Sequence, residues 1–257
     1  MRKDWTREEL ILAFNLYCKL PYGKFNNRNQ EVNELGALIG RTGGAVAFKL
    51  VNFVSLDPVH KAQGRKGATN VGKLDKEIFN EFTNNWDELL YESEKILATK
   101  KQIDIEIIYD DILKDLKNKK GETKIREVKV RINQDIFRKM VLSNFNFRCA
   151  VSQINIPELL IASHIKPWSK DKKNRLNPSN GLCLSGTYDK AFDKGLISLN
   201  DNLEIIISSR LKRFSNQVFY NDYFLEKEGQ KIILPQKFMP DLEFIHYHND
   251  EIFDKIK

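Results

Sequence analysis

Cysteine is scarce in this sequence, and long apolar runs do not occur in it. The three cysteines, Cys18, Cys149 and Cys183, are scattered and form no paired CxxC motif. This excludes a disulfide framework and gives little support to a four-ligand zinc site, so we expect buried, reduced thiols and no structural zinc. No stretch approaches the roughly 18 apolar residues that a membrane-spanning helix needs, and the amino terminus shows no signal-peptide apolar segment. We therefore expect a cytoplasmic protein with no membrane partner.

The composition is that of a folded protein with a surplus of positive charge. Of the 257 residues, 41% are hydrophobic and 30% are charged, which supplies both a core and a solvated surface. A chain of this length favours two domains. The formal net charge is +7, and lysine and arginine gain affinity for phosphates by releasing counterions. The charge favours a polyanionic partner but does not establish one by itself.

The first part of the chain predicts helices. Thr6 and Glu9 have the spacing of a capping box, and they precede an amphipathic pattern. A second helical pattern ends at Gly40 and Arg41, after which Thr42 can cap a third helix. Helices joined by a tight turn that contains glycine are typical of a helix-turn-helix or the related three-helix Myb-like arrangement, in which the third helix here would read DNA.

Polar residues on and after this third helix are candidates for contact with double-stranded DNA. The alternative is a helical bundle that only packs against the rest of the protein. Two more helical patterns follow, so the prediction is a helical DNA-recognition domain over residues 1–99. The candidate DNA contacts are Arg41, Thr42, Lys49 and Asn52 on the helix, and Arg65 and Lys66 in the basic segment after it.

Residues 100–131 differ in composition from the segments on either side. Between Lys114 and Arg131 there are eight lysines and arginines against three acidic residues. Such a charge run is typical of a solvated surface. We interpret residues 100–131 as a basic connector between the helical domain and a second domain over residues 132–257.

The second domain contains the pattern that indicates chemistry. Residues 159–165 are rich in apolar and β-branched types and predict a strand that ends on His164. Asn180 precedes a short second strand at residues 182–184, and Thr187 can cap a helix after it. The order strand, loop, strand and helix can bring a histidine, an asparagine and a carboxylate around one point.

These residue types suit hydrolysis of a phosphodiester. A histidine with a pKa near neutral can take a proton from the attacking water. A carboxylate can hold a hard cation such as Mg²⁺, which neutralises charge on the phosphate and on the leaving oxygen. An asparagine can fix the loop that aims the histidine, through hydrogen bonds between its side chain and the backbone.

The same residues lie in stretches that resemble the HNH endonucleases of the ββα-metal fold, in the branch found in bacterial restriction endonucleases. The stretches are FRKMVLSNFNFRCAVSQI, ASHIKPW, NPSNGLCLSGTYDKAFDKGLISL and, more weakly, PDLEFIHYHNDEIF, and they cover about residues 134–253. They agree with the family in order, spacing and flanking apolar pattern. The resemblance, with the helical first part, implies an α+β fold: an all-helical, helix-turn-helix-like domain followed by a ββα-metal HNH nuclease domain.

The resemblance also assigns roles to individual residues. It makes His164 the general base, and it makes Asn180 the residue that orients the catalytic loop. The third position of the motif is a metal ligand on the helix. Asp189 is preferred there over Tyr188, because a carboxylate ligates Mg²⁺ better than a neutral phenol does. Asp193, four residues later on the same helical face, is the reserve candidate.

Further residues near the motif have alternative interpretations. Ser163 stands where many HNH enzymes have an acidic metal ligand, so only one or two protein ligands are expected. Lys166 and Arg175 flank the site and are candidates for clamping a DNA phosphate, the alternative being solvated loop charges. His246 and His248 have the spacing of one strand face, and we favour packing or phosphate contact for them over a second metal site.

The sequence thus predicts a DNA endonuclease that uses one divalent cation, Mg²⁺ or Mn²⁺ in its place. By resemblance, its role is restriction of foreign DNA, with any dependence on modified bases left open. Nicking, homing and toxin-type nucleases are alternatives within the enzyme class. Outside it, the alternative is a DNA-binding regulator whose HNH fold has lost activity. A homodimer would supply the two active sites that cutting both strands needs.

Overall fold

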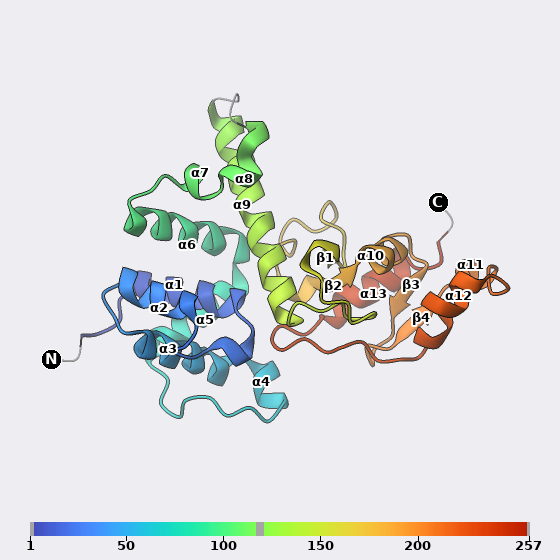
Figure 1. Ribbon diagram of the computed structural model, residues 1–257, viewed down its shortest axis with the longest axis horizontal. Helices are drawn as coiled ribbons and strands as arrows, with labels where there is room; N and C mark the ends of the chain where they lie inside the picture. Colours follow the sequence, from blue (N-terminus) through green and yellow to red (C-terminus); the bar gives the residue numbers. More distant parts are fainter. Residues whose placement is uncertain (1–2, 117–120, 256–257) are drawn as a thin grey trace. The chain divides into compact units, whose positions relative to one another are not determined.

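The computed structural model describes residues 3–116 and 121–255, except for the side chains of residues 88 and 89. The chain divides into two compact units, Met1–Ser143 and Asn144–Lys257 (Figure 1). We call them unit 1 and unit 2, and each is described by itself.

Unit 1 consists of helices and connecting loops in its described residues. A cluster of buried aromatic rings forms its core: the ring of Phe14 lies 4.9 Å from that of Phe53 and 4.8 Å from that of Phe82, measured between centroids. The helices are α1 (Arg7–Lys19), α2 (Gln30–Leu38), α3 (Gly43–Leu56), α4 (Pro58–Ala62), α5 (Lys73–Asn84), α6 (Trp86–Lys101), α7 (Ile105–Ile108), α8 (Asp110–Leu113) and α9 (Gly121–Asn144), with 3-10 turns η1 (Tyr22–Lys24) and η2 (Lys114–Leu116).

The predicted helix starts are confirmed for α1 and α3. Thr6 is the N-cap of α1: its hydroxyl accepts a hydrogen bond from the Glu9 amide (3.3 Å), and the Glu9 carboxylate accepts one from the Thr6 amide (2.9 Å). This is the capping box expected from the sequence. Thr42 caps α3 by accepting a hydrogen bond from the Ala45 amide at 3.1 Å.

The α2–α3 pair has the geometry predicted for a helix-turn-helix arrangement. The chain bends by 108° between the two helices, and helix pairs of this motif cross at about 90–120°. Gly40 lies in the turn with φ of 67°, a left-handed conformation that glycine adopts at no steric cost. Within the described part of the chain, no single helix is long and apolar enough to cross a membrane. By length and composition, only α2 and α3 together pass that test, as this bent pair.

Residues 100–131, predicted to be a connector, are largely helical where they are described; residues 117–120 lie outside the described residues. The helix that begins here, α9, continues to the end of unit 1 and is bonded to other helices of that unit. Asn133 Nδ2 donates to Asp87 Oδ1 (2.7 Å), and Ser143 Oγ donates to the Cys18 carbonyl (3.0 Å). A helix packed against one domain carries charged residues on its exposed side, and a solvated connector between domains has a similar composition. The sequence therefore did not distinguish a packed helix from a connector.

Unit 2 combines two small antiparallel sheets with short helices. Strand β1 (Leu160–His164) pairs with β2 (Gly181–Ser185), and β3 (Ile197–Leu199) pairs with β4 (Ile205–Ile207). Helix α10 (Gly186–Asp193) follows β2 directly and packs against both strands of the first sheet. The remaining elements are α11 (Ser209–Lys212), α12 (Val218–Tyr223), α13 (Leu242–Glu251) and the 3-10 turns η3 (Pro157–Leu159), η4 (Pro178–Asn180) and η5 (Leu225–Lys227).

Two local predictions in unit 2 are wrong. The N-cap of α10 is Ser185 rather than Thr187, and its side chain makes no capping hydrogen bond. His246 and His248 lie on helix α13 rather than on a strand. Asp241 is the N-cap of that helix and accepts a hydrogen bond from the Glu243 amide at 2.9 Å. An aspartate at this position is a sequence signal for the start of a helix, and the interpretation from the histidine spacing overlooked it.

The expectation for the thiols is confirmed. Cys18, Cys149 and Cys183 are all buried, and none of them is in a disulfide. Cys149 Sγ accepts hydrogen bonds from the amides of Ser152 (3.3 Å) and Ser185 (3.2 Å), so this thiol ties the segment before β1 to the end of β2.

Candidate active site

His164 is the last residue of β1, opposite Gly181 of β2, and its ring is partly buried. Its Nε2 lies 2.8 Å from the carbonyl oxygen of Arg175. A carbonyl oxygen can only accept a hydrogen bond, so Nε2 carries the proton. In the neutral ring this makes Nδ1 the nitrogen with the lone pair, which is the atom that can take a proton from water.

The surroundings of His164 favour its neutral form. Burial lowers the pKa of His164 below its ordinary value of 6.5, and the hydrogen bond to the Arg175 carbonyl opposes part of that shift. The ring is therefore largely unprotonated at neutral pH. A general base has to be unprotonated before it can accept the proton of the attacking water.

Asn180 is fully buried, and its side chain hydrogen-bonds to the backbone of two segments that adjoin His164. Its Oδ1 accepts a hydrogen bond from the Lys166 amide (2.8 Å), and its Nδ2 donates to the carbonyls of Lys166 (3.1 Å) and Asn174 (3.3 Å). Lys166 lies two residues after His164, and Asn174 directly precedes Arg175, whose carbonyl holds the imidazole. One amide side chain thus fixes both the turn after β1 and the segment that sets the histidine tautomer.

Trp168 is a residue of this site that the sequence interpretation missed. Its ring meets the His164 ring edge to face, with centroids 5.6 Å apart and an interplanar angle of 82°. The guanidinium carbon of Arg175 lies 4.9 Å from the centroid of the Trp168 ring. His164, Trp168 and Arg175 therefore form a closed set of contacts. The available signal was the tryptophan of the HIKPW stretch, four residues after the histidine.

The basic residues predicted to clamp phosphate are bonded within the loop that follows β1. Lys166 Nζ lies 3.1 Å from the Asp171 carboxylate and 4.9 Å from the centroid of the Tyr247 ring. Burial would raise the pKa of Asp171, but hydrogen bonds from Asn174 and Lys166 outweigh it, and the pKa is lowered. Arg175, besides its contact with the tryptophan, donates from Nε to the Lys172 carbonyl at 3.1 Å. Both residues lie in the loop that follows His164, and the side chain of each already has a partner in this loop.

Helix α10 separates the two candidates for the third position of the motif. Tyr188 is buried, and its hydroxyl donates to the Tyr223 carbonyl at 2.6 Å. Burial, followed by the nearby Cys149 and Tyr223, raises the pKa of Tyr188 to about 12, so the phenol is neutral and occupied. Asp189 is half-exposed on the same helix. Of the two residues, Asp189 is the one available to a ligand from solution.

Asp189 and Asp193 lie one helical turn apart on α10. Burial raises the pKa of Asp193, and the negative charge of Asp189 raises it further. Two carboxylates that repel each other form a donor set that suits a hard cation, because the cation relieves the repulsion. The chemistry of the donors therefore fits Mg²⁺ or Mn²⁺.

The number of protein ligands is small. Among residues 3–116 and 121–255, no three His, Cys, Asp or Glu side chains group closely enough to hold a metal ion. Ser163, at the position where many HNH enzymes have an acidic ligand, is buried, and its hydroxyl has no hydrogen-bond partner. Mg²⁺ usually keeps several waters and binds through one or two carboxylates together with phosphate oxygens. A site on α10 would therefore depend on water and substrate for most of its ligands.

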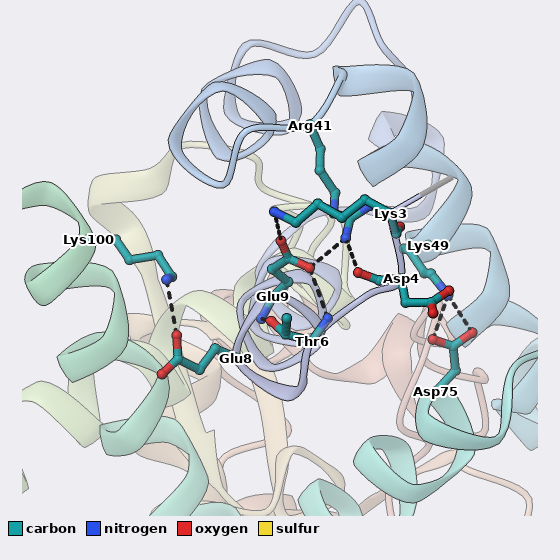
Figure 2. Close-up of polar contacts among 9 residues, drawn as sticks. All are labelled: Lys3, Asp4, Thr6, Glu8, Glu9, Arg41, Lys49, Asp75 and Lys100. Atoms are coloured by element: carbon teal, nitrogen blue, oxygen red, sulfur yellow. Dashed lines mark hydrogen bonds and ion pairs between the residues drawn. The ribbon is translucent and has the colours of Figure 1, made fainter. Parts of the chain in front are cut away.

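In unit 1, the structure places Arg41 differently from the prediction. Its side chain is only 9% exposed. The guanidinium donates to the carbonyls of Lys3 (3.0 Å) and Asp4 (2.6 Å) and to the Glu9 carboxylate (2.7 Å), as Figure 2 shows. The segment before α1 covers this end of α3, which a search for helical periodicity does not reveal.

The exposure predicted for Asn52 is wrong. Asn52 is 2% exposed, and its Nδ2 donates to Asp75 Oδ2 at 2.7 Å. The same carboxylate accepts from Lys49 Nζ at 2.8 Å on each oxygen (Figure 2). Asp75 lies in the first turn of α5, so the packing of α5 against α3 converts a face expected to be open into a buried polar contact.

The other three residues proposed to contact DNA differ in exposure. Thr42 and Lys66 are exposed, whereas Arg65 is partly buried. Arg65 Nη1 lies 2.8 Å from His60 Nδ1, and its guanidinium carbon lies 4.4 Å from the centroid of the Tyr22 ring. Of the six contacts predicted in unit 1, only Thr42 and Lys66 are therefore exposed residues in this structure.

Comparison with known proteins identifies the class of domain that this site defines. Residues 149–200 match the family described as HNH endonuclease, and this range contains β1, β2 and α10 with His164, Asn180 and Asp189. The resemblance predicted from the sequence is confirmed for these residues. Unit 2 contains an HNH endonuclease domain.

One solved structure and the curated proteins complete the comparison. One of the solved structures that match is a modification-dependent TagI restriction endonuclease, which aligns at 21% identity with a TM-score of 0.30 over 45% of this chain. The alignment spans 37% of that protein's chain, well under two thirds of its length. No curated protein matches this chain.

Proposed function

We propose that this protein is a metal-dependent DNA endonuclease, with His164 of unit 2 as the general base. The observation that carries the proposal is the bond from His164 Nε2 to the Arg175 carbonyl, within an HNH endonuclease domain. This bond makes Nδ1 the basic nitrogen, and Asn180 fixes the backbone that makes it.

The proposed reaction is hydrolysis of a phosphodiester by water. Nδ1 of His164 takes a proton from the water, whose oxygen forms a bond to phosphorus while the bond from phosphorus to the 3′-oxygen breaks. The products are a 5′-phosphate and a 3′-hydroxyl, the leaving oxygen taking its proton from solvent. The imidazolium that forms is stabilised by its Nε2–H bond to Arg175. Because burial lowers the pKa of His164, the ring then releases its proton readily.

Asp189 is the proposed metal ligand on α10, with Asp193 as a second. When bound there, Mg²⁺ or Mn²⁺ neutralises charge on the phosphate and on the leaving 3′-oxygen. Lys166 and Arg175 would contact DNA phosphates next to the cut bond, exchanging their present partners in the loop for the backbone of the substrate.

Unit 1 is the proposed recognition module for double-stranded DNA. The helix-turn-helix geometry of α2 and α3 and the net charge of +7 support this role. Thr42 and Lys66, which are exposed, are the candidates for contact with the DNA backbone. A nuclease with its own recognition module is suited to restriction of foreign DNA, and a homodimer would place one active site on each strand.

The test is cleavage of matched plasmids, unmodified and cytosine-methylated, with Mg²⁺, with Mn²⁺ and with chelator. We compare wild type with His164→Ala and with His246→Ala, a matched control in which the lost histidine is 53% exposed and bonded to Asp201. We expect wild type and His246→Ala to cut only with metal, and His164→Ala to bind DNA in chelator without cutting it. Binding of both plasmids without cleavage by wild type would favour an inactive regulator instead.

A further inference from the structure

A hollow of about 540 Å³ opens beside α3 in unit 1, within the size range of small-molecule sites. Two aromatic side chains line it. Phe48 of α3 is 54% exposed, and Trp5 is half-exposed. The Trp5 ring is held from the protein side: the guanidinium carbon of Arg41 lies 4.2 Å from its centroid and Lys49 Nζ lies 5.4 Å from it. A flat apolar surface is therefore kept in place at the wall of an open cavity.

Two of the three cations in the lining, Arg41 and Lys49, are largely buried and paired with carboxylates, whereas the third, Lys3, is 64% exposed and shares Glu9 with Arg41. Arg41 is paired with Glu9 at 2.7 Å, and Lys49 is paired with Asp75 at 2.8 Å (Figure 2). Burial would raise the pKa of Glu9, but the hydrogen bond and the positive charge of Arg41 outweigh it, and the pKa is lowered. Glu9 is therefore ionised at neutral pH. An anion would have to displace these carboxylates to reach Arg41 or Lys49, so the part of the wall around the Trp5 ring suits an uncharged, planar occupant better than a phosphate.

Two polar atoms in the wall lack a hydrogen-bond partner. They are Arg41 Nε, a donor, and Asn52 Oδ1, an acceptor, and both are shielded from water. The second amide atom of Asn52 is committed to Asp75. Buried polar groups are nearly always paired in folded proteins, so an unpaired donor and an unpaired acceptor on two residues that line one cavity call for an occupant. That occupant must present an acceptor and a donor, and the side chains of the lining must move to expose the two buried atoms to it.

We propose that this hollow binds a single nucleobase turned out of the DNA duplex. The base edge supplies the acceptor for Arg41 Nε and the donor for Asn52 Oδ1, and its ring stacks on the aromatic wall. Inside a duplex both faces of a base are covered by its neighbours, so a ring that stacks on Phe48 has to leave the helix. This inference rests on the proposed function, since it takes double-stranded DNA as the substrate of the protein.

The test uses short duplexes built on the sequence around a mapped cleavage site, with chelator present to prevent cutting. One duplex is fully paired, and the others each carry one unpaired A, C, G or T opposite an abasic position. Dissociation constants are measured by fluorescence anisotropy. Because an unpaired base costs least to turn out, at least one of these duplexes should bind wild type on the order of 10-fold more tightly than the paired duplex.

Variants at the exposed aromatic residue assign that gain to the hollow. Phe48→Ala should lose the gain and keep its affinity for the paired duplex, whereas Phe48→Tyr, which retains an aromatic face, should keep both. Ile107→Ala is the matched control, because Ile107 is an apolar side chain of unit 1, 67% exposed and outside the lining of the hollow. It should behave as wild type does.

The outcomes separate this inference from the proposed function. If wild type cuts its site and binds all the duplexes equally, no base enters the hollow, and the inference fails while the nuclease stands. The inference also fails if the gain survives in Phe48→Ala. If no cleavage site can be mapped, the proposed function has already failed in its own assay, and the inference falls with it.

Discussion

Replacing Asn180 with alanine should damage both the stability and the activity of unit 2. The side chain is fully buried and makes three hydrogen bonds to backbone atoms, at 2.8, 3.1 and 3.3 Å. A hydrogen bond contributes about 1 kcal/mol net, so the variant should lose about 3 kcal/mol of unfolding free energy. The loss is concentrated at the Lys166 amide, whose hydrogen-bond acceptor is removed.

The activity of Asn180→Ala should fall because His164 loses its alignment. Displacement of a reacting group by about 1 Å can cost roughly 10²-fold in rate, and we expect a loss of that order in single-turnover cleavage. DNA binding in chelator should not change. Hydrogen exchange monitored by mass spectrometry gives the local readout, since the Lys166 amide should exchange faster in the variant.

Asn177→Ala is the matched control for this experiment. Asn177 lies three residues away, and its side chain accepts one hydrogen bond, from the Ser179 amide at 3.0 Å. It should therefore cost about 1 kcal/mol and leave the cleavage rate close to that of wild type. The reasoning is refuted if Asn180→Ala cuts DNA at the wild-type rate, or if the two variants lose activity equally.

Three further predictions concern unit 2. Trp168→Ala should lower the single-turnover cleavage rate about 10-fold, because an aromatic pair contributes about 1 kcal/mol. Trp168→Phe keeps an aromatic ring against His164 and should retain most of the rate. Equal rates for the two variants would contradict the positioning role of Trp168. Asp189→Asn should raise the Mg²⁺ concentration for half-maximal cleavage by roughly 10- to 100-fold or more. Loss of a residue that only supports a metal ligand costs about that much in affinity, and Asp189 is proposed to be a ligand itself. An unchanged Mg²⁺ titration would exclude Asp189 as a ligand. Burial lowers the pKa of His248 to about 4, against a weaker opposing effect of its bond to the Phe192 carbonyl. The unfolded state therefore binds the proton first, so urea unfolding should show stability falling between pH 6.5 and 4 by about 3 kcal/mol, a slope that His248→Asn should remove.

Much of the fold could be predicted because its signals are local. The capping box of Thr6 and Glu9, and the cap at Thr42, depend on residues three positions apart, and both occur in the structure. The strand ending at His164 follows from a short apolar run. The helical nature of residues 121–131 was missed, because the bonds that attach α9 to unit 1 join residues far apart in sequence.

The candidate site divides in the same way. His164, Asn180 and Asp189 lie within residues 149–200, which match the HNH endonuclease family, and they were predicted from the resemblance of the sequence to that family. The carbonyl of Arg175 was not identified as the partner of His164, because any residue can supply a backbone carbonyl and the sequence gives no sign of which one does. Asn52 was misplaced for a related reason: Asp75, the carboxylate that binds it, lies on another helix.

The central claim is that His164 is the general base of DNA hydrolysis. The most direct measurement is the single-turnover cleavage rate of a plasmid as a function of pH, at saturating Mg²⁺, for wild type, His164→Ala and His246→Ala. Because burial lowers the pKa of His164 below 6.5, the wild-type rate should rise with pH, level off below pH 6.5 and then stay constant. His246→Ala should reproduce that profile, and His164→Ala should show no cleavage above background. A wild-type profile without this inflection, or cleavage by His164→Ala at the wild-type rate, would contradict the claim.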